Sequence, residues 1–306
     1  GTSIKVIYGD DDRVDVADSN NSLYIKLAKS TAAMIKNSKL KEYNNYQIEV
    51  VSKSLEESGV CASESFAKQP AAASCSGFLV AKNMLVTAGH CIRSQFDCDN
   101  SSWVFNYKVD YKDQSKVIVE KSDVYKCSRV TSRELESTTQ IDYAVIELEK
   151  EVVDRRPLKF RTEGKPAVGT ELVVIGHPSG LPTKIADGAQ VRSSNDVFLV
   201  ANLDTYGGNS GSAVFNAISG EVEGILVRGD TDYIHNPQLG CRVSNQVADM
   251  SGRGEDVTLI TAVKGLPEQQ EPEPEEPEQE EPEVEEPEED NSFTARLRRF
   301  LRRVFG

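Results

Sequence analysis

The sequence predicts an all-β protein. Its body contains apolar runs of four to eight residues with many β-branched side chains, separated by turns rich in Gly, Asn, Pro and Asp. Runs of this length fit the strands of a barrel or a sandwich better than they fit helices. Among them, in chain order, are SGFLVA, MLVTA, YAVIEL, ELVVIGH, DVFLVANL, SAVFN and EGILVRG.

One segment near the start of the chain departs from this pattern. Residues 22–36 have the apolar spacing of a helix, whereas TAAMI inside the same segment equally fits a first barrel strand. The expectation for this segment therefore stays open between a helix and a strand.

Length and charge limit the classes of protein that need to be considered. The chain has 306 residues, of which 38% are hydrophobic, and no apolar stretch reaches the roughly 18 residues of a membrane span. We expect a soluble protein, or one already trimmed, because no signal segment is visible at its start. The net charge of −14 arises from residues 267–290, which hold 13 Glu and one Asp. The body is only mildly acidic, which predicts no nucleic-acid partner.

The tail divides into two segments. Residues 267–290 contain too few apolar side chains to fold, so we expect a disordered acidic Pro/Glu linker. Residues 291–306 hold five Arg, and their apolar residues fall on one face of a helical wheel. This pattern predicts a basic amphipathic helix that binds a membrane surface or a protein partner, or that folds back as an autoinhibitor. The alternative is an unstructured basic end, since so short a helix is marginal in water.

The six cysteines favour disulfides. None lies in a CxxC pair or in metal-ligand spacing with His, and the alternative is six unpaired buried thiols. Disulfides indicate a secreted or periplasmic location. One pair has a local reason: Cys91 lies 16 residues after Cys75, and a bond between them would fasten the turn at His90 to the preceding strand.

His90 is the histidine with the most informative surroundings among the three in the chain. It follows the apolar strand in LVTAGHC, where small residues let the backbone turn sharply and direct the imidazole into a cleft. The default expectation for a histidine is a surface or packed residue, so this position needs partners elsewhere in the chain.

Two further segments supply such partners. In GGNSGS, glycines flank Ser210, and the backbone N–H groups of Gly208 and Ser210 could converge on a developing oxyanion. In QIDYAVIEL, Asp142 begins an apolar strand, where a buried carboxylate needs a donor such as an imidazole N–H. The order His, Asp, Ser along the chain gives these separate signals their weight.

With these residues in place, the chain resembles the trypsin-like serine peptidases of chymotrypsin fold, in particular the bacterial branch that includes the glutamyl endopeptidases. The resemblance rests on TAGHC, IDYAVIEL and GGNSGSAVFN, and covers roughly residues 6–265. It implies Ser210 as nucleophile, His90 as general base and acid, Asp142 as orienting carboxylate, and Gly208 with Ser210 as oxyanion hole.

The resemblance also implies the domain organisation. We expect two packed six-stranded antiparallel β-barrels within a peptidase domain at residues 6–266, with the barrel boundary near residues 135–165. Residues 1–5 would then be a propeptide remnant, which makes Lys5–Val6 a maturation site of a zymogen. Two departures from the family are Ala213, where Pro is usual, and Asn209, which excludes the buried ion pair that animal trypsins form with their new N-terminus.

For specificity, the resemblance places Asp204 at the base of the primary pocket and Val227, Arg228 and Gly229 along its wall. An acid there would bind Arg or Lys. Leu226 stands where the glutamyl enzymes use His, which weakens an acidic preference. Asp204 could instead point away, or Arg228 could swing in and neutralise it, leaving acidic or narrow specificity open.

We therefore expect a serine endopeptidase that acts through an acyl-enzyme and cleaves after Arg or Lys, with protein or peptide substrates. The alternative is a non-catalytic binding module on a peptidase scaffold. No cofactor is expected, and the chemistry requires no metal. The acidic run at residues 10–12 could bind Ca²⁺, but it fits an acidic turn better. Activity should appear as pH rises through the range in which a free imidazole titrates, near 6.5.

Overall fold

A computed structural model describes residues 7–8, 11–203, 207–228, 233–247 and 253–269. By its internal contacts the chain divides into two units, Gly1–Glu268 and Gln269–Gly306. The predicted C-terminal helix and nearly all of the predicted linker lie outside the described residues. In the described part of the chain, no helix is long and apolar enough to cross a membrane.

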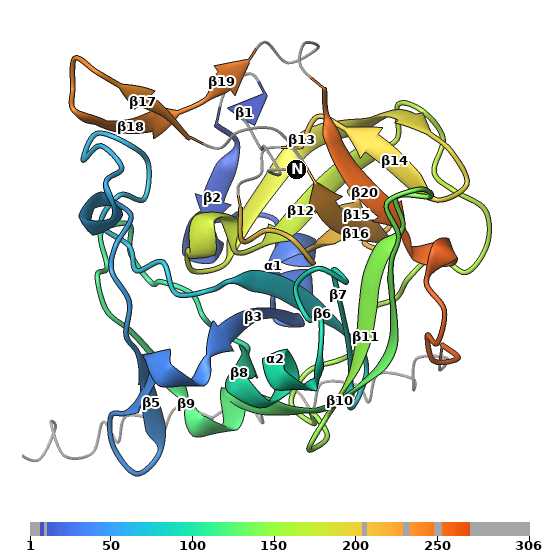
Figure 1. Cartoon of the computed structure of the whole chain (residues 1–306), viewed down its shortest axis with the longest axis horizontal. Helices are drawn as coiled ribbons and strands as arrows, with labels where there is room; N and C mark the ends of the chain where they lie inside the picture. The colour runs from blue at the N-terminus through green and yellow to red at the C-terminus, as the bar shows by residue number, and fades with distance from the viewer. Residues whose placement is uncertain (1–6, 9–10, 204–206, 229–232, 248–252, 270–306) are drawn as a thin grey trace, which may run out of the picture. The chain divides into compact units, whose positions relative to one another are not determined.

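The first barrel is a closed ring of six antiparallel strands in the order β10-β11-β7-β6-β3-β8 (Figure 1). Its strands are β3 (Thr31–Lys36), β6 (Cys75–Ala81), β7 (Met84–Thr87), β8 (Ser101–Val104), β10 (Val124–Leu135) and β11 (Asp142–Leu148). The ring closes because β10 pairs with both β8 and β11.

The second barrel also closes on six strands, in the order β12-β15-β16-β20-β14-β13 with β13 pairing back to β12. Its strands are β12 (Glu171–Gly176), β13 (Lys184–Ser194), β14 (Phe198–Ala201), β15 (Ala213–Asn216), β16 (Val222–Arg228) and β20 (Glu255–Leu259). A seventh strand, β2 (Arg13–Asp15), adds to the outer edge of β13. The expected fold of two six-stranded barrels is thereby confirmed.

Alternation along the strands fills both barrel interiors and the interface between the barrels. In β12, Leu172 and Val174 belong to the cluster inside the second barrel, whereas Val173 and Ile175 belong to a cluster that also contains first-barrel residues such as Phe78. A strand directs successive side chains to opposite faces, so one apolar run fills the barrel interior and also the barrel interface. Trp103 and its neighbours fill the first barrel.

The open segment at residues 22–36 contains both predicted elements. Helix α1 (Ser22–Ala28) begins after Asn21, whose side chain accepts hydrogen bonds from the backbone N–H groups of Leu23 and Tyr24, and β3 follows. An N-cap of this kind satisfies otherwise unpaired helix donors, and β-branched residues then favour the strand.

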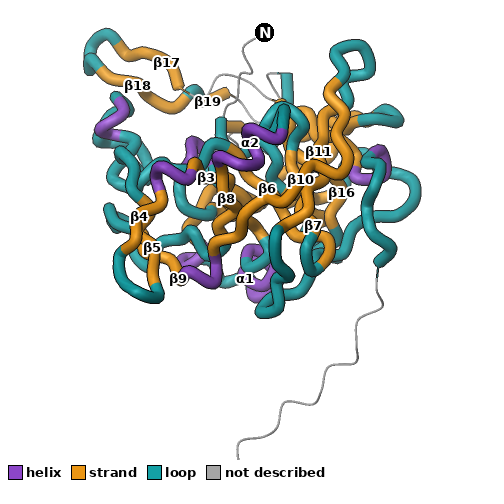
Figure 2. The backbone as a smooth tube through the Cα atoms, turned by 60° about the horizontal axis from the view of Figure 1, so that its bottom comes forward, coloured by secondary structure: helices purple, strands orange, loops and turns teal. Residues whose placement is uncertain are grey.

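Several elements were not predicted. Within the barrels, strands β8, β10, β13 and β20 lie outside the runs quoted above. Outside the barrels are helix α2 (Gln95–Asn100), the sheet of β4 (Leu40–Glu42), β5 (Gln47–Val50) and β9 (Val117–Glu120), the hairpin of β17 (Tyr233–Asn236) and β18 (Cys241–Ser244), and the short parallel pair of β1 (Ile7–Tyr8) and β19 (Gln246–Val247). Figure 2 shows the β17–β18 hairpin standing out from the barrel strands. The Cys61–Cys241 disulfide ties it to an earlier loop.

Candidate active site

Gly89 brings His90 close to the start of β11. A β-carbon at residue 89 would lie 2.7 Å from the Tyr143 carbonyl oxygen and 3.2 Å from Asp142 Oδ1, so only glycine fits between the turn and the strand. The small residues before His90 therefore do what the sequence indicated: they let the turn after β7 pack directly against β11.

Asp142 holds the imidazole and the backbone of His90 together. His90 Nδ1 lies 2.8 Å from Asp142 Oδ2, and the His90 backbone N–H donates to Oδ1 at 3.1 Å. The carboxylate is buried, with 2% of its side chain exposed, and His90 keeps 29%. Because both carboxylate oxygens are engaged by one residue, the ring cannot rotate without breaking a charge-assisted hydrogen bond.

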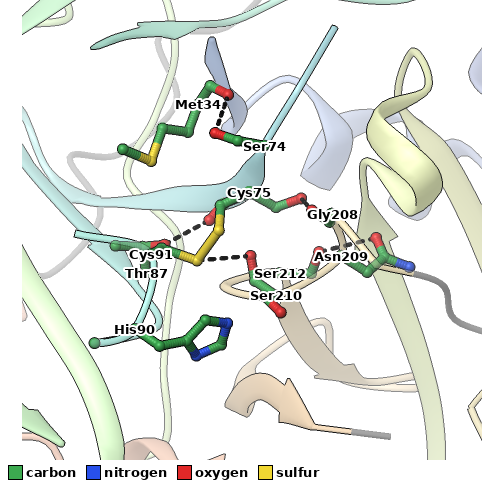
Figure 3. The surroundings of a disulfide bond; sticks show 12 residues. Met34, Ser74, Cys75, Thr87, His90, Cys91, Gly208, Asn209, Ser210 and Ser212 are labelled. Carbon is green, nitrogen blue, oxygen red and sulfur yellow. Dashed lines mark hydrogen bonds between the residues drawn. A yellow bond between two sulfur atoms is a disulfide. The ribbon is translucent and has the colours of Figure 1, made fainter. Parts of the chain in front are cut away.

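Ser210 lies at the junction of the two barrels. Its carbonyl oxygen accepts a hydrogen bond from the Ser76 N–H at 2.8 Å and lies 3.6 Å from Cys91 Sγ, next to His90 in the chain. In Figure 3 the Ser210 side chain and the His90 imidazole point toward the same space. The structure thus places His90 and Asp142 in contact, and Ser210 beside the strand and the disulfide that adjoin the histidine turn.

The loop before Ser210 has a backbone conformation that glycine adopts without strain and other residues do not. Gly208 has φ +94°, and a β-carbon there would come within 2.7 Å of the Gly180 nitrogen and of the His177 carbonyl oxygen. The Gly208 carbonyl accepts from Ser76 Oγ at 3.0 Å. Within the described residues, the Gly208 N–H donates to no backbone carbonyl. This amide is therefore suited to receive an anion.

Asn209 orders this loop without a charge. Its side chain accepts a hydrogen bond from Ser212 Oγ at 3.1 Å, and its carbonyl accepts one from the Ser212 N–H at 2.8 Å. Both residues are buried. A neutral amide needs no counter-ion, so the loop keeps its shape without the ion pair that the sequence already excluded.

Ser76 and His177 support the site and were not predicted. The Ser76 hydroxyl accepts from the His177 backbone N–H at 3.0 Å and donates to Gly208, so it connects both barrels behind the loop. The His177 ring is completely buried, with Nδ1 3.1 Å from the Leu181 carbonyl, and burial lowers its pKa to about 3. In the sequence, the one signal that could have pointed to His177 was its position directly after the apolar run ELVVIG.

The Cys75–Cys91 disulfide lies next to the histidine turn, above the His90 imidazole in Figure 3. It joins strand β6 to the histidine turn across a Cα–Cα distance of 6.1 Å, as the sequence proposed. The remaining four cysteines form Cys61–Cys241 and Cys98–Cys127, whose connectivity the sequence left open.

Comparison with known proteins decides the family. Residues 75–225, which span His90, Asp142 and Ser210, match the family model of the trypsin-like peptidase domain. This region of the chain is a trypsin-like peptidase domain. It is a serine endopeptidase, and the alternative of a non-catalytic module is set aside. A search of curated protein sequences finds no match to this peptidase.

Solved structures similar to the peptidase are remote in sequence. A Glu endopeptidase bound to MPD is 15% identical, with a TM-score of 0.47, over 84% of this chain and 94% of that one. The active form of the Rv3671c protease from Mycobacterium tuberculosis is 14% identical, with a TM-score of 0.47, over 87% and 89%. The VesB protease of Vibrio cholerae is 14% identical, with a TM-score of 0.47, over 80% and 64%.

The predicted specificity wall of the peptidase is described only in part. Val227 and Leu226 are fully buried. Arg228 turns toward β11 and β20, with Nε 3.2 Å from Asp256 Oδ2 and Nη2 donating to the Gln140 carbonyl at 2.7 Å. Asp204, Gly229 and the Lys5–Val6 bond lie outside the described residues.

The acidic run near the start of the peptidase contains a structural ion pair. Asp11 Oδ1 accepts from Arg13 Nε at 2.7 Å, and Oδ2 accepts from Arg13 Nη2 at 2.9 Å. A bidentate pair of this kind uses the carboxylate oxygens that a cation would need. The described part of the run therefore favours the acidic turn.

Proposed function

We propose that this endopeptidase cleaves peptide bonds through an acyl-enzyme, with His90, Asp142 and Ser210 as its catalytic triad. The observation that carries the proposal is the pair of hydrogen bonds between His90 and the buried Asp142 carboxylate, at the barrel junction where Ser210 also lies. An imidazole with Nδ1–H held by a carboxylate has Nε2 available to accept a proton.

In the proposed mechanism, Ser210 Oγ attacks the scissile carbonyl carbon while its proton passes to His90 Nε2. The oxyanion is stabilised by the N–H groups of Gly208 and Ser210. When the C–N bond breaks, His90 gives the proton to the leaving amine. Water, deprotonated by the same imidazole, then hydrolyses the ester and restores Ser210.

Ser210→Ala tests this proposal. Because triad members act as a unit, kcat should fall by about 10⁶. A fluorophosphonate probe should label the wild-type protein on Ser210 and leave the variant unlabelled, as read by intact-protein mass. Ser219→Ala, on an exposed turn, is the matched control and should retain full activity. A Ser210→Ala protein with wild-type turnover would contradict the proposal.

For specificity, we propose cleavage after Arg or Lys, with Asp204 as the pocket acid. Support comes from Arg228, whose guanidinium is engaged by Asp256 and the Gln140 carbonyl, so it has other partners than the pocket acid. A panel of fluorogenic peptides that differ only before the scissile bond tests the assignment. Higher kcat/KM for Glu than for Arg would replace it with the acidic alternative.

We further propose an extracytoplasmic location and a tail that binds a membrane surface or a protein partner. Three disulfides support the location. The tail proposal rests on the five arginines opposite an apolar face in residues 291–306. Co-sedimentation with anionic liposomes should retain the full chain and release a chain ending at Leu266. Equal behaviour of both, with faster hydrolysis by the shorter chain, would indicate autoinhibition instead.

Maturation at Lys5–Val6 has its own test. We propose that cleavage there generates the active form, because the family resemblance begins at Val6 and basic specificity would permit self-processing. N-terminal sequencing of the active enzyme should find Val6. An active enzyme that still begins at Gly1 would count against it.

A further inference from the structure

Arg228 contacts the candidate catalytic carboxylate. Its Nη1 lies 3.9 Å from Asp142 Oδ2, the same oxygen that lies 2.8 Å from His90 Nδ1. The Asp142 side chain is 2% exposed and that of Arg228 is 27% exposed, so water screens this contact only in part. The carboxylate therefore faces two cationic partners whenever the imidazole is protonated.

The guanidinium is held in this position by two other groups. Asp256 Oδ2 accepts from Arg228 Nε at 3.2 Å, and the Gln140 carbonyl accepts from Nη2 at 2.7 Å. Strand pairing sets the same geometry, since Arg228 lies opposite Asp256 between β16 and β20. Arg228 is thus a fixed charge beside Asp142.

Other charged groups also surround the turn and the carboxylate. Arg93 Nε donates to the His90 carbonyl at 3.2 Å, and Arg133 Nε donates to the Gly89 carbonyl at 2.8 Å. Glu134 accepts from the Tyr143 hydroxyl at 3.4 Å and pairs with Lys264. Arg253 pairs with Asp256 Oδ2, the oxygen that also accepts from Arg228 Nε. Among these charged side chains, Arg228 and His90 contact the Asp142 carboxylate within the described residues.

We propose that Arg228 is a positioning residue that extends the activity of this peptidase to lower pH. The inference rests on the proposed triad. A carboxylate stabilises the imidazolium that forms when His90 takes up a proton, and a second cation on the same oxygen opposes that stabilisation. The peptidase should therefore keep its activity to a lower pH with Arg228 in place than without it.

The test is the pH dependence of kcat/KM on one peptide substrate. Arg228→Gln removes the charge, so the midpoint of the acid limb should move upward by about 0.5 to 1 pH unit, a size set by two charges several ångströms apart in partly screened surroundings. Arg228→Lys keeps the charge and should stay close to the wild-type midpoint. A role in packing or in substrate contact alone would change KM or stability without moving the midpoint.

Arg253→Gln is the matched control, because it removes a charge from the same Asp256 without a contact to Asp142. It should leave the midpoint unchanged. The inference is overturned if the Gln variant has the wild-type midpoint, if the Lys variant shifts as far as the Gln variant, or if Arg253→Gln gives an equal shift. Should Arg228→Gln not fold, Arg228→Met, which preserves the aliphatic stem, is measured in its place. Loss of activity in Ser210→Ala tests the proposed function independently of these outcomes.

Discussion

At the scale of single residues, the candidate site depends on positions where a side chain is excluded as much as on those that carry chemistry. Gly208 combines φ +94° with backbone atoms 2.7 Å from where a methyl group would stand. An L side chain there is both strained and obstructed. The amide proposed for the oxyanion hole is therefore specified by the absence of a β-carbon.

Gly208→Ala should lower kcat by about 10² to 10³, the loss expected when one oxyanion donor is displaced. The control is Gly169→Ala, at φ +86° with no atom within 4 Å of the added carbon. It carries the same backbone strain, so it should cost only about 1 kcal/mol of the free energy of unfolding and leave kcat intact. Steady-state kinetics and urea unfolding of both variants check this. Full activity in Gly208→Ala would show that this amide is not needed.

At the scale of elements, a buried ion pair attaches the N-terminal strand β2 to the second barrel. Lys184 Nζ on β13 lies 2.5 Å from Asp15 Oδ1, and both side chains are 1% exposed. Gln69 completes the cluster, with Oε1 accepting from Lys184 at 2.8 Å and Nε2 donating to Asp15 at 2.9 Å. Burial lowers the pKa of Lys184 to about 8, against the opposing charge of Asp15.

Removing one partner of this ion pair should strongly destabilise the folded protein. Asp15→Leu or Lys184→Met alone should lower the free energy of unfolding by about 3 to 5 kcal/mol, because each leaves a buried charge without its partner. The double variant should lose clearly less than the sum of the two. Urea unfolding of the wild type, the two single variants and the double variant gives a double-mutant cycle. The same cycle on the exposed pair Lys68–Asp113 is the control, and its coupling energy should be about 0 to 1 kcal/mol. Additive losses at Asp15 and Lys184 would argue against the ion pair as an anchor.

At the scale of the whole molecule, the burial of His177 at the barrel junction should make the stability of the protein fall in acid. Its folded pKa of about 3 lies below the ordinary 6.5 because the ring is buried, with Lys184 adding a smaller contribution. Between these values the unfolded chain binds a proton that the native protein does not. Stability is therefore present above about pH 6.5 and is lost as pH falls toward 3.

His177→Phe should make the free energy of unfolding depend less steeply on pH. In the wild type, the free energy of unfolding should fall by up to about 1.4 kcal/mol per pH unit from this one group. The variant should lack that contribution, as measured by urea unfolding at pH values from 3 to 7. His235→Phe, on the exposed β17–β18 hairpin, should keep the wild-type slope. An unchanged slope in His177→Phe would show that another group causes the acid loss.

Each run quoted as a predicted strand overlaps a strand of one of the barrels, whereas the buried strands β8 and β20, which mix polar with apolar residues, lie outside those runs. Runs such as YAVIEL and ELVVIGH are continuous and apolar because one face fills a barrel and the other fills the barrel interface. The β4–β5–β9 sheet and the β17–β18 hairpin were missed because their strands are partly exposed and mixed in polarity. Their pairing depends on partners far apart in the chain.

The sequence alone determined the all-β class and the residue types, order and turn chemistry of His90, Asp142 and Ser210, because local sterics and strand periodicity leave marks in a few consecutive residues. Only the tertiary structure decided that Ser76 and His177 brace the loop at Gly208, that Cys61 joins Cys241, and that Arg228 faces Asp142. Those contacts join segments up to 180 residues apart. They form only when two closed barrels pack together, which no local pattern records.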